Sequence, residues 1–121
     1  MKESRWIRFR FIALAYLICI TIAFLLPGSA LPKQNWFAAI YLDKWIHVIL
    51  FAGLVIAWSL GFSSSPKASM IIFLLAVLYG ILIEFAQELF IKNRSLDFFD
   101  ILADLAGSIL GYTLVRGYIK K

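Results

Sequence analysis

Two short runs of carboxylate and amide side chains stand out between residues 84 and 104. Two residues follow Glu84 by three and four positions, and the members of the second run are spaced three and four apart, so on a helix each run falls on one face. The first run is Glu84, Gln87 and Glu88, and the second is Asp97, Asp100 and Asp104. Because only a short turn-like segment at 92–96 separates the runs, we expect two neighbouring helices that point these groups at each other.

Glu84 and Asp104 form the pair with the clearest chemical use. Both lie about seven residues from the turn, which at 1.5 Å per residue places them at a similar depth, about 10 Å along their helices. Two carboxylates close together in a low dielectric do not both ionise cheaply, and such a pair suits a proton carrier or a general acid and base. The candidate catalytic residues are His47, Glu84, Asp100 and Asp104.

An earlier segment adds cationic and imidazole groups to this chemistry. Asp43 and His47 are four positions apart and share a helix face, with Lys44 next to them. Lys44 and Arg94 could hold a phosphate or carboxylate, and the guanidinium of Arg94 suits a bidentate contact. The predicted substrate-binding residues are Asp43, Lys44, Gln87, Glu88 and Arg94.

A purely structural interpretation of these residues stays open. Lys44 and Arg94 can neutralise Asp43 and Asp97 as ion pairs at helix ends, and Asp97 can simply begin a helix, where Asp is a favoured residue. His47 on an apolar helix can be a packing residue. Under this interpretation the cluster only holds the helices together.

A divalent metal is compatible with the residue types but not indicated by their spacing. His47, Glu84 and Asp104 could supply imidazole and carboxylate ligands. The sequence contains no His-Glu-Xxx-Xxx-His motif, no cysteine pair and no phosphate-binding glycine loop. The single cysteine, Cys19, lies inside an apolar run and cannot form an internal disulfide.

The elements that must position these groups are membrane spans. The 121 residues are 63% hydrophobic and only 16% charged, far from the balance of an ordinary soluble domain. Apolar runs predict spans at about 8–26, 44–62, 69–91 and 97–115 within one domain, 1–121. The first run is longer than the ~7–15 apolar residues of a signal peptide, so it is interpreted as a span and not as a cleaved leader.

The sequence therefore predicts an all-α polytopic membrane protein, a bundle of four transmembrane helices. With four spans, one side of the membrane holds eight of the twelve Lys and Arg residues, and the positive-inside rule places both termini in the cytoplasm. The basic residues flank apolar runs, which argues against nucleic-acid binding. Gly107 and Gly111 continue the stripe of Asp100 and Asp104, and this spacing predicts close helix packing.

The order and spacing of these residues resemble the VanZ-like family of small bacterial membrane proteins over roughly residues 40–115. The residues that carry the resemblance are Asp43, Lys44, His47, Phe51, Glu84, Gln87, Arg94, Asp100, Gly107 and Gly111. Asp104 stands where the family usually has Asn, and the family's Pro-Gly-Arg turn is Lys-Asn-Arg here. The resemblance implies a multi-pass protein of the bacterial cytoplasmic membrane, in a family whose founding member is linked to teicoplanin resistance.

Three functional hypotheses follow. In the first, the cluster at the outer leaflet binds or modifies an anionic lipid or cell-wall precursor, as part of a protein of the cell envelope. In the second, the buried acids serve a proton- or ion-coupled transporter or channel subunit. In the third, the chain is a noncatalytic assembly protein whose cluster is structural. Under all three hypotheses the lipid bilayer is a partner, and the protein works alone or as a small homo-oligomer. The residue types do not decide whether the protein is an enzyme.

Overall fold

The computed structural model describes residues 2–26, 42–62, 65–91 and 97–119. These residues form four α-helices, named α1 (Lys2–Phe24), α3 (Leu42–Phe62), α4 (Pro66–Phe90) and α5 (Phe98–Ile119). The prediction of an all-helical chain is confirmed for this described part. Each helix contains a stretch long and apolar enough to cross a bilayer, which needs about 20 apolar residues.

Local sequence signals explain where α4 and α5 begin. Ser65 caps α4, because its hydroxyl oxygen accepts a hydrogen bond from the Ala68 N–H at 3.2 Å, and Pro66 fills the first helical position. Asp97 does the same for α5: its Oδ1 accepts from the Phe99 N–H at 2.9 Å. A polar residue immediately before each apolar run therefore fixes the start of the helix.

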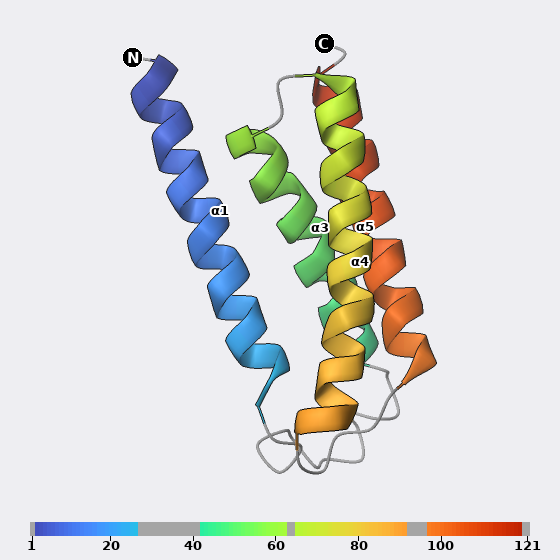
Figure 1. Cartoon of the computed structure of the whole chain (residues 1–121). Helices are drawn as coiled ribbons and strands as arrows, with labels where there is room; N and C mark the ends of the chain where they lie inside the picture. Colours follow the sequence, from blue (N-terminus) through green and yellow to red (C-terminus); the bar gives the residue numbers. More distant parts are fainter. Residues whose placement is uncertain (1, 27–41, 63–64, 92–96, 120–121) are drawn as a thin grey trace.

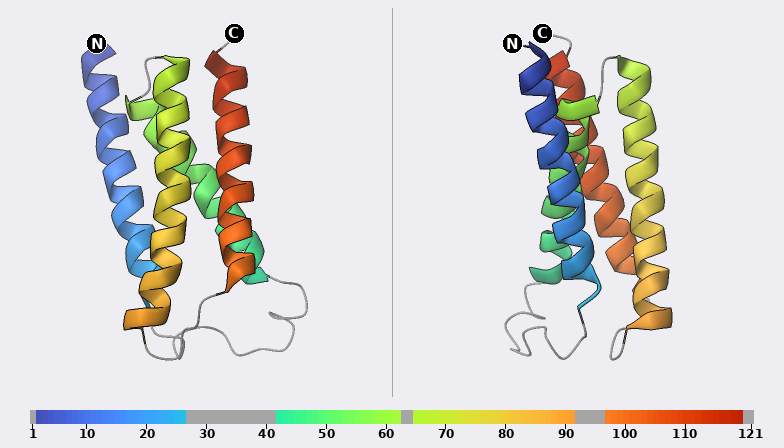
Figure 2. Two further views of the ribbon diagram at one scale, coloured as in Figure 1. Left: turned by 45° about the vertical axis from the view of Figure 1, so that its right-hand side comes forward. Right: turned by 60° about the vertical axis from the view of Figure 1, so that its left-hand side comes forward.

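The helices run alternately in opposite directions, so the start of α1 and the end of α5 lie at the same end of the bundle (Figure 1). The most extensive contact is between α3 and α5, and α1 packs chiefly against α3. Figure 2 shows that α4 stands on the other side of the bundle from α3. The α3–α5 pair is thus the centre of the fold, and both of its helices carry residues of the predicted site.

Two glycines bring α5 unusually close to α3. A Cβ added to Gly107 would overlap the backbone carbonyl of Val48, and one added to Gly111 would come within 2.6 Å of the Ala52 carbonyl oxygen. Only a residue without a side chain allows the two backbones to approach this far, which is how small residues pack helices in membranes.

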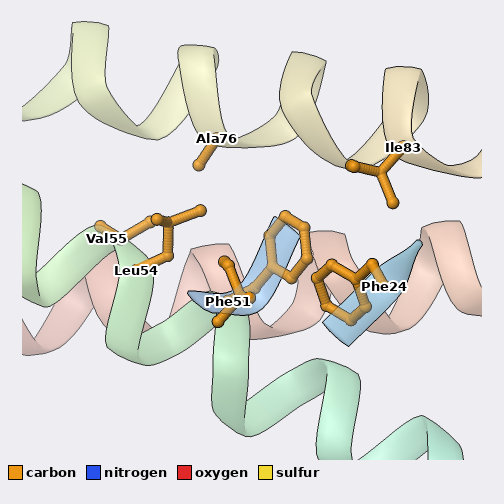
Figure 3. Packing of buried hydrophobic residues seen from close by; sticks show 7 residues of the cluster. Phe24, Phe51, Leu54, Val55, Ala76 and Ile83 are labelled. Atoms are coloured by element: carbon orange, nitrogen blue, oxygen red, sulfur yellow. The ribbon is translucent and has the colours of Figure 1, made fainter. Parts of the chain in front are cut away.

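Away from the close contact that Gly107 and Gly111 make with α3, the interior of the bundle is apolar and aromatic. Figure 3 shows Leu54 and Val55 on α3 facing Ala76 on α4, and Ile83 on α4 opposite Phe24, with Phe51 between the two groups. The outer surface is also apolar: Phe11 is 68% exposed and Leu89 is 71% exposed. Helices that carry apolar side chains both toward the bundle interior and toward the surroundings are adapted to lipid. The protein is a multi-pass membrane protein.

Candidate functional site

Four polar side chains are buried together at the end of the bundle opposite the termini. They come from three helices and are His47, Glu84, Gln87 and Asp104. Ionisable groups within a span cost at least about 2.5–3.5 kcal/mol each on insertion scales. Facing the bundle interior reduces this penalty, because the groups can then bond one another.

His47 and Asp104 form the innermost contact. His47 Nδ1 lies 2.6 Å from Asp104 Oδ1, and either partner can carry the shared proton. The imidazole is stacked against the ring of Phe24, with 4.9 Å between centroids. Its other nitrogen, Nε2, is 3.9 Å from Asp100 Oδ2. The ring is therefore held between two carboxylates and an aromatic face.

Lys44 joins α3 to the beginning of α5. Its Nζ lies 2.6 Å from both Asp97 Oδ2 and Asp100 Oδ1. The three side chains are partly exposed, and Asp97 is the most open at 39%. They form an outer layer of the site, above the buried His47–Asp104 pair.

Glu84 ties α4 to the same region and keeps one oxygen unpaired. Its Oε1 accepts a hydrogen bond from the Asp97 N–H at 3.3 Å. Glu84 Oε2 and Asp104 Oδ2 are buried and have no hydrogen-bond partner in the described part of the chain. Buried polar atoms are nearly always paired, so these two oxygens are the positions where a proton or a ligand donor is most needed.

The remaining predicted site residues are placed differently. Gln87 is buried, but its Nε2 donates to the backbone carbonyl of Phe24 at 2.7 Å, which fastens α4 to the end of α1. Glu88 is exposed, and the structure does not bring it to the His47–Asp104 pair. The side chain of Asp43 and all of Arg94 lie outside the described residues.

Sequence reasoning missed the role of Gly80. A Cβ at this position would lie 3.0 Å from Asp104 Oδ2 and 3.1 Å from Phe51 Cε1, so the missing side chain makes room for the carboxylate against α4. The sequence did indicate that Gly80 lies near the site, because Gly80 is four positions before Glu84 and shares its helix face. Phe24, which stacks on His47 and accepts from Gln87, carried no comparable signal.

The arrangement gives no support to the metal alternative. Within the described ranges, no group of three or more His, Cys, Asp or Glu side chains is placed to hold a metal ion. The acids are instead engaged with Lys44, His47 and a backbone N–H. The site is best described as two hydrogen-bonded layers, one partly open and one buried.

The outer layer should give a measurable pH dependence through Asp97, which precedes the α5 span. Partial burial acts to raise the pKa of Asp97, but the hydrogen bonds from Lys44 and from the Phe99 N–H outweigh it, so the pKa lies below its ordinary value of 3.8. A lowered folded-state pKa contributes stability above the ordinary value, and this contribution is lost as the pH falls through the folded-state pKa.

We therefore expect Asp97→Asn to melt below the parent at pH 6, with the difference starting to shrink below the ordinary pKa of 3.8 and vanishing only once the pH has fallen through the lowered folded-state pKa. Asn keeps the capping ability of Asp, so the variant isolates the charge. Melting temperatures of the two purified proteins between pH 3 and pH 7 provide the measurement. A difference that stays constant over this range would show that the Lys44 contact contributes no charge-dependent stability.

Comparison with known protein families gives one result that spans nearly the whole chain. The family model VanZ/LLP1 matches residues 5–120. Searches of curated proteins and of solved structures found no match. The family match includes α3, α4, most of α1 and α5, and every residue of the two-layered site, and the chain belongs to the VanZ/LLP1 family.

Proposed function

We propose that this protein acts at the cell envelope from the bacterial cytoplasmic membrane, where its polar cluster binds the head group of an anionic lipid or cell-wall precursor in the outer leaflet. The observation that carries the proposal is the two-layered site at the end opposite the termini. The positive-inside rule, which puts the end with more Lys and Arg in the cytoplasm, supports an outward-facing site.

The outer layer supplies the entry point. Lys44 carries a positive charge at the site, and its ammonium bonds Asp97 and Asp100. An incoming phosphate would compete with these carboxylates for the ammonium of Lys44, and Asp97 is the more exposed of the two. Because Asp97 lies at the very start of α5, its side chain can turn toward water when Lys44 binds the ligand.

The inner layer supplies proton transfer. Asp100 contacts Lys44 through Oδ1 and approaches His47 through Oδ2, so it links the entry point to the His47–Asp104 pair. A proton released near Lys44 can reach His47 through Asp100 and be stored on Asp104, which bonds His47 and whose second oxygen is unpaired in the described part of the chain. General acid and base catalysis requires such a connection between a buried store and the reacting group.

A proton- or ion-coupled transporter is the second candidate, favoured by the same succession of acids. Further into the membrane, the hydroxyls of Thr21 and Tyr79 bond each other, 2.5 Å apart. Toward the termini, the recess between α1, α3 and α4 is lined by apolar or aromatic side chains, including Leu17, Leu54 and Ala76, and the described buried polar residues near that end of α3 and α4 are Ser59 and Ser69, which carry no charge. This interior favours a binding site over a pathway through one chain. Proton flux in liposomes that depends on Asp104 would reverse the preference.

The test is native mass spectrometry of the protein purified with a bacterial lipid extract. We expect the parent to retain an anionic lipid that Lys44→Gln loses, because the cation of the outer layer has been removed. Arg116→Gln is the matched control, since it removes one positive charge from α5 at the opposite end. Equal retention by the parent and Lys44→Gln, with both folded, would contradict the proposal.

We also propose that this site protects cells against teicoplanin when it both binds its ligand and transfers a proton. Expression of the parent in a sensitive host should raise the inhibitory concentration of teicoplanin, whereas Lys44→Gln and Asp104→Asn at equal abundance should not. Resistance that follows abundance alone in all three proteins would favour a noncatalytic assembly role.

A further inference from the structure

A groove on the bundle lies nearer the termini than the polar cluster does. It has a volume of about 200 Å³ and lies between α1, α3 and α4, with Leu17, Trp58, Leu75 and Tyr79 among its lining residues. Leu75 is 58% exposed, so the groove opens on the outer surface of the bundle. All these residues belong to membrane-spanning stretches, and the surrounding medium is therefore lipid hydrocarbon.

Aromatic and hydroxyl groups separate this groove from the site around His47. Tyr79 closes one end, where its hydroxyl bonds Thr21 of α1. The Tyr79 ring packs on Phe51, with 5.8 Å between centroids, and Phe51 packs in turn on Phe24. Phe24 is the residue stacked on His47. The groove and the polar cluster thus lie on opposite sides of a layer of rings.

Arg10 stands at the other end of the groove. It lies two helical turns before Leu17 on the same face of α1, about 10 Å away along the helix axis. Its Nε donates to the Gly61 carbonyl at 3.0 Å, and its guanidinium lies 5.1 Å from the centre of the Phe62 ring. Phe62 is stacked on Trp58 at 4.7 Å, so the cation is fixed to the groove wall.

The remaining donors of Arg10 are available for an anion. Arg10 is an exposed residue, and within the described part of the chain its hydrogen bond to Gly61 uses Nε alone. The two Nη groups are the fork that binds phosphate oxygens in a bidentate way. The fixed guanidinium of Arg10 can bind the phosphate of a phospholipid, and the apolar groove beside it can hold an acyl chain.

We propose that the groove holds one acyl chain of an anionic phospholipid from the leaflet next to the termini, with its phosphate bound by Arg10. The positive charge of Arg10 selects an anionic head group, and the apolar walls of the groove hold the acyl chain. α1 gains from this arrangement, because it packs chiefly on α3 and has little contact with α4; the lipid chain fills the space between α1 and α4. The proposal does not depend on the site around Lys44.

The test uses Trp58 as a reporter of the groove. In a variant with Trp6, Trp36 and Trp45 changed to Phe, brominated phosphatidylglycerol in nanodiscs should quench Trp58 at about a fivefold lower mole fraction than brominated phosphatidylcholine. Both lipids offer a phosphate, but only phosphatidylglycerol has a net negative charge, and the attraction of anionic lipid to one Lys or Arg is worth about 1 kcal/mol. Arg10→Gln should bring this preference close to one, and Arg10→Lys should keep part of it.

Three further variants separate this site from its surroundings. Leu75→Phe, which narrows the groove, should reduce quenching by both lipids, whereas Leu74→Phe on the neighbouring exposed face should not. Lys44→Gln should leave the preference unchanged, which distinguishes this lipid from a ligand of the polar cluster. Equal quenching by the two lipids in the parent, or a preference that survives Arg10→Gln, would overturn the proposal.

Discussion

Replacing Gly107 by alanine is expected to lower the free energy of unfolding by about 1–3 kcal/mol or more, the range found for overpacked cores. The added Cβ would meet the carbonyl carbon and Cα of Val48, both at 2.9 Å, and overlap its carbonyl oxygen. Backbone atoms cannot rotate out of the way, so α3 and α5 must move apart. His47 directly precedes Val48, and the separation would therefore also stretch the His47–Asp104 contact.

Gly117→Ala provides the matched control on the same helix. A Cβ there would meet nothing within 4 Å, and Ala is the better helix former by about 0.5–1 kcal/mol. We expect this variant to melt at or above the temperature of the parent in detergent micelles. A similar loss of stability in both variants would contradict the assignment of the Gly107 effect to its close contact with α3, since helix propensity alone favours Ala at both positions.

The four helices could be predicted because a membrane span is a one-dimensional signal. Long apolar runs are bounded by residues such as Pro66 and Asp97, and lipid requires the backbone of each run to bond within itself. The stripe of Asp100 and Asp104 with its two glycines also indicated which face of α5 turns inward. Composition and spacing sufficed for these features, because none of them depends on how neighbouring helices are rotated.

Partner choice could not be predicted in the same way. Lys44 was expected to neutralise Asp43 or Asp97, and the structure shows it bonded to Asp97 and also to Asp100. This second bond depends on the rotation of α5 relative to α3, which the Gly107 contact sets. Neither the spacing of His47 nor that of Asp104 identified them as a bonded pair, since they are 57 positions apart in the sequence.

The face of α4 shows the same limit within a single helix. Glu84, Gln87 and Glu88 were assigned to one face, and that grouping is correct only to the width of a helical stripe. At about 100° per residue, Gln87 and Glu88 lie on opposite flanks of Glu84. The buried stripe runs through Ala76, Gly80, Ile83, Glu84 and Gln87. Glu88 therefore falls beyond its edge and is exposed.

Asp104→Ala is expected to be the most damaging substitution in the site, with a loss of about 3–5 kcal/mol. It removes the partner of His47 Nδ1 and leaves the imidazole buried beside Phe24 without its hydrogen bond. Replacing both partners together, as His47→Phe with Asp104→Leu, should recover much of the stability, because hydrophobic residues of similar volume often substitute for a buried pair without penalty. Thermal melts of the three proteins measure this difference.

The double variant also distinguishes the two roles of the cluster. If His47 and Asp104 store a proton for the outer layer, a protein that regains its melting temperature should still fail to protect cells against teicoplanin. Lys44, Asp97 and Asp100 remain in this variant, so lipid binding should persist while the proton step is lost. Recovery of both stability and protection would show that the pair serves only to hold α3 against α5, and a proton-transfer role would have to be abandoned.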